Sequence, residues 1–409
     1  MNKKTSLKYI ILYSAILIVS ILAIYIYFEP LQIYHSGFIN KKIDKITNAQ
    51  NIAPQRLYIN TWRTVKNEYV DPSMNNQNWL RWRNKYSKHI KTMDDANIAI
   101  NTMLASLNDP YTKFLKTEIY SKQQEILDSQ ITGIGIILNK TGENITINHV
   151  LDNSPAQKGQ IQVGDTILSV NGKDVKSANI DTLINKTKND KEQDIKITLK
   201  RNGKIIEKTV KKAKIPIKTM QYNFIDKDIA LITLATIMGK DTIKDFKTAI
   251  DKTNNAKGII IDLRDNYGGI LSNAIEMANY MLFDEEIVSI ESSKRKLHIF
   301  ASEETIFKKK PIVILVNKKT ASAAEVLAGS LKDNLGAIII GESTYGKNSI
   351  QQIIPMANKT GLIITASKYI LPKGEDIHNT GIKPDYITKK DEQFELAIKI
   401  IKDMTKNVL

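Results

Sequence analysis

The chain has no cysteine among its 409 residues, and this absence removes several kinds of chemistry. Disulfide bonds, thiolate nucleophiles and metal sites with cysteine ligands are all excluded. Histidine is also scarce, and none of the five stands at metal-ligand spacing with a carboxylate motif. We therefore expect neither a metal nor an organic cofactor. The five histidines are His35, His89, His149, His298 and His378.

Acidic residues are fewer than basic ones, with 43 Asp and Glu against 59 Lys and Arg, which gives a net charge of +16. Such a balance can indicate a nucleic acid, an anionic membrane or an acidic polymer as a neighbour. The lysines are spread along the whole chain, and no compact basic block lies beside stacking aromatics, so we do not expect nucleic-acid binding. The hydrophobic share of 42% is that of an ordinary globular protein, and the length allows two or three domains.

One uncharged hydrophobic run stands at the N-terminus, at residues 9–28, and has the length needed to span a bilayer. Three lysines lie in residues 1–8, so these residues are predicted to be cytoplasmic and the rest of the chain extracytoplasmic. A cleavable signal peptide would need a shorter apolar core and a small-x-small cleavage site, so we expect an uncleaved transmembrane anchor. The alternative is a buried hydrophobic helix. The predicted location is the inner or cytoplasmic membrane, single-pass, with the catalytic part on the periplasmic side.

Residues 29–56 are predicted to form a polar stalk, and residues 57–125 a helical region with apolar residues three to four positions apart. Its three tryptophans are interpreted as core residues. The segment Ser106–Leu115 follows a helical run, and Asp109-Pro110 within it favours a turn. The tryptophans are Trp62, Trp79 and Trp82.

Residues 128–214 change to short strands separated by glycine turns, with one helix expected at 179–188, which indicates a small β-rich domain. This run resembles a PDZ domain along SPAQKGQIQVGDTILSVNG. The resemblance makes Gly133-Ile134-Gly135-Ile136 the loop that binds a peptide carboxylate. A glycine-bounded turn exposes successive backbone N–H groups to the carboxylate, and the peptide adds as an edge strand. The plainer alternative is that these glycines only permit a tight entry into a strand.

Residues 220–390 alternate strands with helices of about ten residues, which predicts an α/β domain with a largely parallel sheet, and residues 391–409 form a terminal helix. Within this domain, residues 311–356 form a strand, turn, helix, strand and loop. Ser322 heads the helix, and Lys347 ends the loop. Ser322 and Glu325 fit the S-x-x-E pattern of a helix capping box, but a serine at a strand-to-helix junction also suits a nucleophile.

The loop before Lys347 follows an apolar strand, as a nucleotide-binding P-loop does. Asn348 stands where a magnesium-binding hydroxyl belongs, and the next residues look extended and supply no helix N-terminus, so we reject that interpretation. The G-x-S-x-G motif of α/β-hydrolases is not present either, because Tyr345 stands at the position of its second glycine. His378 lies in a Gly/Pro-rich surface segment and is treated as a bystander. Without an obvious histidine or a thiol, a Ser–Lys pair remains the economical hydrolase chemistry.

A lysine acts as a base only when neutral. Bringing its pKa from about 10.4 to about 7.5 requires roughly 4 kcal/mol of penalty on the charged form, which burial among apolar runs can supply.

The chain resembles the C-terminal processing peptidases, also called tail-specific proteases, between Arg56 and Tyr386. The resemblance rests on DPYT, the PDZ-like run, IDLRDNYGG, TASAAE and GESTYGK. It implies Ser322 as nucleophile, Lys347 as general base and Gln351 as the residue that orients the lysine. It also implies an oxyanion hole from the backbone N–H of Ala323 and that of Gly268 or Gly269. The sequence departs from the family pattern at Asp265, Tyr267, Ala324 and Asn348.

The expected fold class is therefore an α/β catalytic domain with a parallel-sheet ββα-type core, an inserted β-rich PDZ domain, an N-terminal helical region and one transmembrane helix. The expected function is that of a membrane-anchored serine endopeptidase acting on proteins or peptides with apolar C-termini. The rival is a non-catalytic PDZ scaffold that only binds protein tails. Whether a second copy of the chain or an adaptor protein is a partner stays open.

Overall fold

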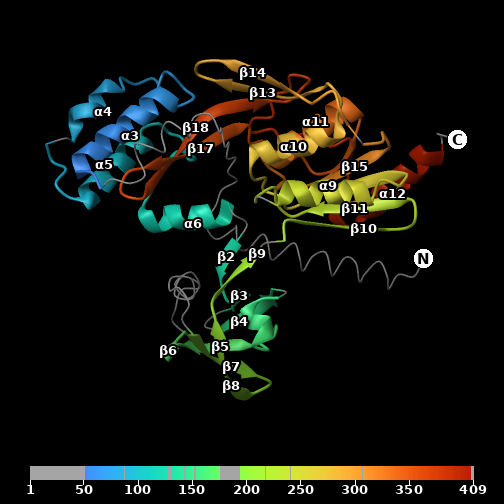
Figure 1. The fold of residues 1–409 in the computed structure, drawn as a ribbon, viewed down its shortest axis with the longest axis horizontal. Coiled ribbons are helices and arrows are strands. Elements are labelled where there is room, and N and C mark those ends of the chain that lie inside the picture. Colours follow the sequence, from blue (N-terminus) through green and yellow to red (C-terminus); the bar gives the residue numbers. More distant parts are fainter. Residues whose placement is uncertain are drawn as a thin grey trace. The chain divides into compact units, whose positions relative to one another are not determined.

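The computed structural model describes residues 51–406, except 87, 128–129, 142–143, 152, 176–193, 217, 240 and 306. The predicted anchor, most of the stalk and the helix expected at 179–188 lie outside the described residues. In the described part, no helix combines the length and the hydrophobicity that a membrane span requires. The described chain divides into two compact units, one of residues 125–218 and one of residues 51–124 with 219–406 (Figure 1).

The helical region packs on the strands of the larger unit (Figure 1). Thr92 and Asp95 form a capping box that starts α5, each side chain accepting the other's backbone N–H. Trp62, Trp79 and Trp82 are buried, which confirms them as core residues, in a cluster that also contains Leu362 of β18. The elements here are α3 (Pro54–Glu68), α4 (Leu80–Lys85), α5 (Met93–Ala105), β1 (Lys113–Leu115) and α6 (Thr117–Leu127).

The smaller unit is an antiparallel sheet in the order β3-β4-β5-β7-β8, with β6 beside β5. Asn202 and Gly203 both have positive φ, 48° and 81°, as the two-residue turn between β7 and β8 requires. Strand β3 pairs only with β4 among the described strands, so its other side is a sheet edge. The elements are β2 (Gln130–Gly133), β3 (Ile136–Thr141), β4 (Asn144–Val150), α7 (Pro155–Lys158), β5 (Thr166–Val170), β6 (Lys173–Asp174), β7 (Asp194–Arg201), β8 (Lys204–Lys211) and β9 (Ala213–Pro216), which pairs with β2.

The larger unit contains the predicted parallel sheet, in the order β10-β11-β12-β15-β16-β19, and only β10 runs antiparallel to its neighbour. All residues of β12 and β15 are buried, as expected for strands covered on both faces. Ile259 and Ile312 join the core that includes residues of α9, α10 and α11, while α12 contacts β12 and β15 as well. The elements are β10 (Met220–Phe224), β11 (Ile229–Leu234), α9 (Thr242–Lys252), β12 (Gly258–Asp262), α10 (Leu271–Met281), β15 (Ile312–Val316), α11 (Ala323–Leu335), β16 (Ile338–Gly341), β19 (Tyr386–Ile387) and α12 (Lys390–Lys406).

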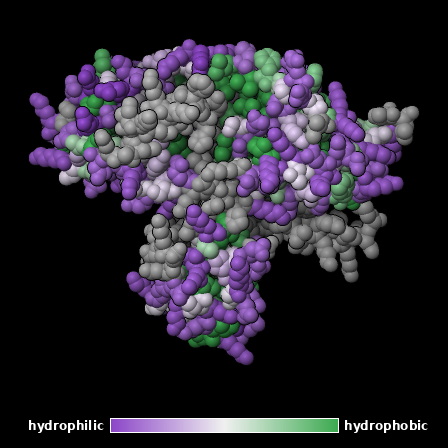
Figure 2. Space-filling view, in the orientation of Figure 1, coloured by the Kyte–Doolittle hydropathy of each residue, from purple (hydrophilic) through white to green (hydrophobic). Residues whose placement is uncertain are grey.

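A second, antiparallel sheet connects the helical region to the rest of the larger unit. Its order is β1-β18-β13-β14, and β17 pairs with β18. Strand β17 begins at Ser349, directly after Lys347 and Asn348, which confirms that an extended segment follows the lysine and that no P-loop helix forms there. The strands are β13 (Glu286–Ser292), β14 (Lys296–Phe300), β17 (Ser349–Met356) and β18 (Thr360–Ile370). Hydrophilic residues cover most of the face drawn in Figure 2.

Candidate active site

Ser322 lies between β15 and α11 in a backbone conformation that non-glycine residues rarely adopt, with φ 62° and ψ −123°. Such a conformation costs about 1–3 kcal/mol and is concentrated at functional sites. Ser322 is fully buried, and its Oγ has no hydrogen-bond partner among the described residues. A buried hydroxyl without a partner is costly and therefore marks a site where a further group is expected.

The carboxylate of Glu325 joins Ser322 to the loop that carries Lys347. Its Oε2 accepts the backbone N–H of Ser322 at 2.7 Å and that of Lys347 at 3.0 Å. Its Oε1 accepts the Gly346 N–H at 2.7 Å and the Thr344 hydroxyl at 2.5 Å. Of the two hydrogen bonds of a capping box, the one from the Ser322 N–H to the Glu325 carboxylate therefore forms. The Ser322 hydroxyl makes no hydrogen bond to the helix. Burial raises the pKa of Glu325, although these four donors favour its charged form.

Lys347 is 2% exposed, and its Nζ donates a hydrogen bond to Gln351 Oε1. The Gln351 amide nitrogen donates to Ser349 Oγ and Thr365 Oγ1, each at 3.1 Å. Because both hydrogens of this amide are used, its oxygen must face the lysine. The structure thus brings Lys347 into direct contact with Gln351, the residue that the resemblance implies, and this acceptor carries no charge.

The ring of Tyr111 lies on another side of the lysine amine, with Lys347 Nζ 4.5 Å from the ring centroid. Tyr111 comes from the DPYT segment before β1. Sequence reasoning identified this segment as a turn and as one of the motifs behind the family resemblance, with no role at the site. Its contact with the lysine could not be read from any local pattern.

The two glycines after β12 lie against the turn of Ser322. Gly268 has φ 90°, and a Cβ there would come 2.9 Å from Ala323 N and 3.0 Å from Ser322 Cβ. The Gly268 N–H donates to Asn266 Oδ1 at 2.8 Å. By contrast, the N–H groups of Gly269 and Ala323 donate to no described residue. Of the two glycines that the sequence offered, Gly269 is therefore the one whose N–H remains available to an incoming oxygen.

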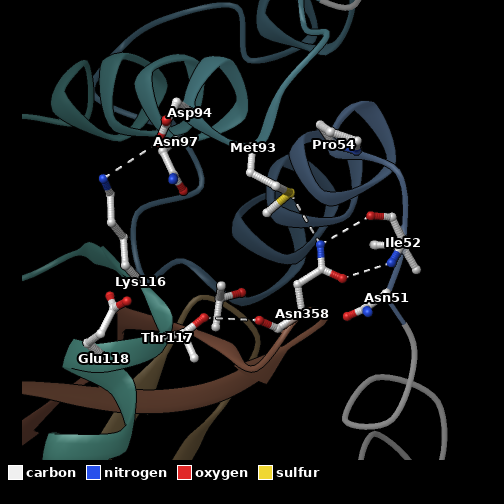
Figure 3. A pocket seen from close by; sticks show the side chains of 11 residues that line it. Asn51, Ile52, Pro54, Met93, Asp94, Asn97, Lys116, Thr117, Glu118 and Asn358 are labelled. Atoms are coloured by element: carbon white, nitrogen blue, oxygen red, sulfur yellow. Dashed lines mark hydrogen bonds and ion pairs between the residues drawn. The ribbon is translucent and has the colours of Figure 1, made fainter.

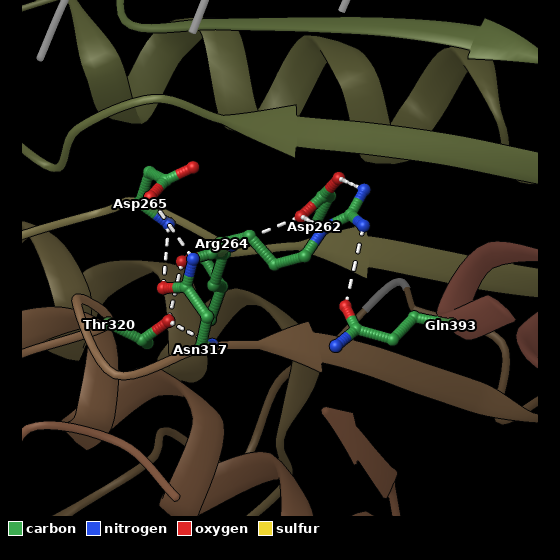
Figure 4. Close-up of polar contacts among 7 residues, drawn as sticks. Asp262, Arg264, Asp265, Asn317, Thr320 and Gln393 are labelled. Carbon is green, nitrogen blue, oxygen red and sulfur yellow. Dashed lines mark hydrogen bonds and ion pairs between the residues drawn. The ribbon is translucent and has the colours of Figure 1, made fainter. Parts of the chain in front are cut away.

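The loop that carries these glycines is anchored by charged residues, and Figure 4 shows its contacts. Asp265 has φ 60°, and its N–H donates to Asn317 Oδ1 at 3.0 Å. Its carboxylate accepts a hydrogen bond from Asn317 and lies 3.4 Å from Lys319 Nζ. Arg264 pairs with Asp262 at 2.6 Å. The negative charge of Asp265 is thus stabilised by the Lys319 ammonium and the Asn317 amide.

Asn266 is a residue that sequence reasoning missed. It is fully buried, and its side chain links the glycine loop to the end of strand β11. Its side-chain amide nitrogen donates to the Leu234 carbonyl at 2.9 Å, and its main-chain carbonyl oxygen accepts the Ala321 N–H at 3.0 Å. Asn266 therefore fixes the glycine loop and the turn of the serine together.

The glycine loop of the smaller unit is tightly built. Gly135 has φ 82°, and a Cβ there would lie 2.3 Å from Ser154 Cβ, so no larger residue fits. The Ile134 side chain is buried, and its carbonyl accepts the Ala156 N–H at 2.8 Å. Ile136 is the first residue of the edge strand β3. Gly133 ends β2.

A separate cavity of about 600 Å³ lies in the larger unit between α5, α6 and the β17–β18 turn (Figure 3). None of the candidate catalytic residues lines it. Asn358 holds it together through hydrogen bonds to Ile52 N and O at 2.8 and 3.1 Å. Within the described residues, no three His, Asp or Glu side chains gather as metal ligands would.

The chain is similar to known proteases over most of its length. The family model "Peptidase family S41" matches residues 228–388, and a PDZ domain model matches residues 124–200. A carboxyl-terminal-processing protease of Picosynechococcus is 32% identical over 82% of this chain and 84% of its own length. The carboxy-terminal processing protease CtpA of Bacillus subtilis is 33% identical over 72% of this chain and 64% of its own. A solved structure of a photosystem II D1 C-terminal processing protease matches with a TM-score of 0.59 and 26% identity, over 86% of this chain and 98% of that one.

Proposed function

This chain belongs to peptidase family S41 and is a serine-type peptidase, and we propose that Ser322, Lys347 and Gln351 carry out its peptide-bond hydrolysis. The observation that carries the assignment is the environment of Lys347, a buried amine whose hydrogen-bond partner is a neutral amide. Burial disfavours the ammonium form, and an amide oxygen accepts a hydrogen bond without adding the negative charge that would retain the proton.

In the proposed reaction, Lys347 Nζ takes the proton of Ser322 Oγ as Oγ attacks the carbonyl carbon of the scissile bond. The carbonyl electrons move onto its oxygen. The ammonium then gives the proton to the leaving nitrogen as the carbonyl re-forms and the C–N bond breaks, which releases the amine and leaves an ester to Ser322. Water, deprotonated by Lys347, attacks the ester carbon, the C–Oγ bond breaks, and the proton returns to Ser322 Oγ as the acid product leaves.

We assign the oxyanion hole to the N–H groups of Ala323 and Gly269. Both lack a hydrogen-bond partner in the described part of the chain, and Ala323 is the first residue of α11, where the helix dipole favours negative charge. The packing of Gly268 against Ser322 supports the placement, because it brings this loop to the nucleophile.

Substrate selection is assigned to the PDZ domain. The open edge of β3 offers backbone groups for an added peptide strand, and the turn at Gly133–Ile136 is the proposed site for its terminal carboxylate. The named relatives process carboxyl termini. By this reasoning, the substrates are proteins or peptides with apolar C-termini. The hydrophobic run at residues 9–28 supports a membrane anchor, with the peptidase on the extracytoplasmic side.

The test uses an unstructured peptide with an apolar tail, in free-acid and C-terminally amidated forms. We expect hydrolysis of the free acid, several-fold slower hydrolysis of the amide, and no turnover by Ser322→Ala. Equal rates for the two peptides would contradict tail capture but leave the catalytic assignment standing. Turnover by Ser322→Ala would contradict the catalytic assignment. Tail binding without turnover by the unmodified protein would favour the scaffold.

A further inference from the structure

We propose that Tyr111 is a positioning residue for Lys347, and that its ring stabilises the ammonium formed when the lysine takes the proton of Ser322. This inference rests on the proposed function, because it assigns a partner to the proposed general base. It starts from the placement of Lys347 Nζ, 4.5 Å from the centroid of the Tyr111 ring. That separation is within the range in which an aromatic face attracts a cation.

Tyr111 is held in place by its own turn. Asp109 Oδ1 accepts the Tyr111 N–H at 2.9 Å, and Asp109 Oδ2 accepts the Thr112 hydroxyl at 2.6 Å. Proline at position 110 restricts the backbone between them. The DPYT segment is therefore a rigid turn that presents one aromatic ring.

The same turn is linked to the other side of the lysine. Thr112 Oγ1 accepts the Thr365 N–H at 3.1 Å, and Thr365 Oγ1 accepts a hydrogen bond from the Gln351 amide that orients Lys347. The ring and the amide are thus fixed relative to each other through one strand, β18. The position of the Lys347 amine is therefore defined by two contacts, one with the Tyr111 ring and one with the Gln351 amide oxygen.

The physical role follows from the difference between the two protonation states. An aromatic face attracts an ammonium strongly and a neutral amine weakly, which changes a protonation equilibrium by roughly 3- to 30-fold in a desolvated site. The ring therefore stabilises the lysine after proton transfer more than before it, as a catalytic contact must. Burial disfavours the ammonium form, and the ring makes the amine a stronger base than burial alone would.

Other charged groups near Lys347 are arranged differently. Glu325 contacts its backbone N–H. Asp376 contacts the side chain of the next residue, Asn348, at 2.9 Å, and Asp109 contacts the backbone of Tyr111. In these contacts the carboxylates meet backbone or neighbouring groups, whereas the ring and the Gln351 oxygen meet the amine itself. The ring therefore adds to the Gln351 oxygen a second contact that favours the ammonium over the neutral amine without introducing a full charge.

The test is the pH dependence of kcat/KM for Tyr111→Leu and Tyr111→Phe in the full chain. Removing the ring destabilises the ammonium, so the acid limb of the profile should move to lower pH by about 0.5–1.5 units, and the plateau rate should fall by about 3- to 30-fold. Tyr111→Phe keeps the ring and should retain the unmodified profile. Tyr86→Leu is the matched control, because that ring also lies beside a lysine, 5.3 Å from Lys85 Nζ, and it should leave the acid limb in place.

Substituting pentafluorophenylalanine at position 111 keeps the ring's shape while reversing the charge of its face, so it should reproduce the shift of Tyr111→Leu even if that variant folds poorly. An unmoved acid limb in folded Tyr111→Leu or in the fluorinated protein would overturn the inference. If Lys347→Ala is inactive in the same assay, such a result leaves the proposed function intact. Full turnover by Lys347→Ala would instead overturn the proposed function itself.

Discussion

Ser322 and Lys347 donate their backbone N–H groups to the same oxygen atom, Oε2 of Glu325, over 2.7 and 3.0 Å. Two segments that are separate in the sequence are thereby held at one point. The carboxylate contacts the main chain of both the proposed nucleophile and the proposed base, and it is fully buried. It fixes the main chain of both residues, so its effect on the reaction is through their positions.

Replacing Glu325 with glutamine should therefore damage both stability and activity. The amide keeps the size of the side chain, but its NH₂ group faces backbone donors in place of an acceptor. We expect a loss of about 2–4 kcal/mol in the free energy of unfolding and at least a tenfold lower kcat/KM. Glu342→Gln is the control, since that carboxylate is only partly buried and its pair with the exposed Lys318 is worth less than about 1 kcal/mol. Unchanged activity in Glu325→Gln would refute the positional role.

Gly268→Ala tests the closeness of the oxyanion loop to Ser322. The added methyl group would meet Ala321 O at 2.6 Å, and φ is 90°, so we expect a cost of about 1–3 kcal/mol in stability and a fall in kcat of about 100-fold. Gly203→Ala is the matched control, with φ 81° but no atom within 4 Å of its Cβ. It should cost stability and leave kcat per folded molecule unchanged. Equal kcat for both variants would argue against the contact.

Gln351→Glu should shift the pH profile in the direction opposite to Tyr111→Leu. A carboxylate beside Lys347 Nζ stabilises the ammonium, so a higher pH is needed to produce the neutral amine. We expect the acid limb of kcat/KM to move up by about 1 unit or more, with activity partly recovered in alkaline buffer. A downward shift or no shift would show that this amide does not face the base during catalysis.

The pair of Asp165 and Arg201 predicts how the PDZ domain responds to acid. Burial favours a higher pKa for Asp165, but the Arg201 guanidinium, bound at 2.6 and 2.7 Å, and the Gln162 N–H hold its pKa below the usual 3.8. A depressed pKa contributes stability above pH ~4 that is lost as pH falls through the folded-state value.

Arg201→Gln should accordingly cost about 1–3 kcal/mol near neutral pH and less at pH ~3, measured by calorimetry of the domain's transition. The control is Lys196→Gln, which removes an exposed pair with Glu207. Its effect should stay below about 1 kcal/mol at both pH values. A cost for Arg201→Gln that does not shrink in acid would contradict the assigned ionisation.

The sequence predicts much of this fold because its signals are local. The apolar runs at β12 and β15 mark buried parallel strands, and the extended pattern of residues 349–356 is strand β17. The pairing of Lys347 with Gln351 is implied by the family resemblance, because four residues of extended chain span about 13 Å and the spacing alone does not bring the two side chains together. In the structure, the register of β17 shifts between Ile350 and Gln351, next to this contact. The sequence predicts the helices of the helical region but not their packing on β17 and β18. The spacing of apolar residues shows which face of a helix is buried, but not which surface it is buried against.

The rest of the site depends on contacts between distant segments. The sequence identifies Glu325 as part of a capping box. It does not predict that Glu325 binds the loop at residues 344–347, because the rest of α11 and strand β16 lie between them in the chain. The ring of Tyr111 reaches Lys347 only because β1 pairs with β18, which in turn pairs with β17. Side-chain roles of this kind follow from tertiary pairing, which local propensity does not encode.

The most direct test of the central claim is the position of the adduct formed by a serine-reactive fluorophosphonate, located by peptide mapping and mass spectrometry. An activated nucleophile should carry the label at Ser322, and Lys347→Met, which leaves no base, should lower the labelling rate by at least about 100-fold while remaining folded. Labelling at another serine, or an unchanged rate at Ser322 in Lys347→Met, would contradict the proposed Ser–Lys site.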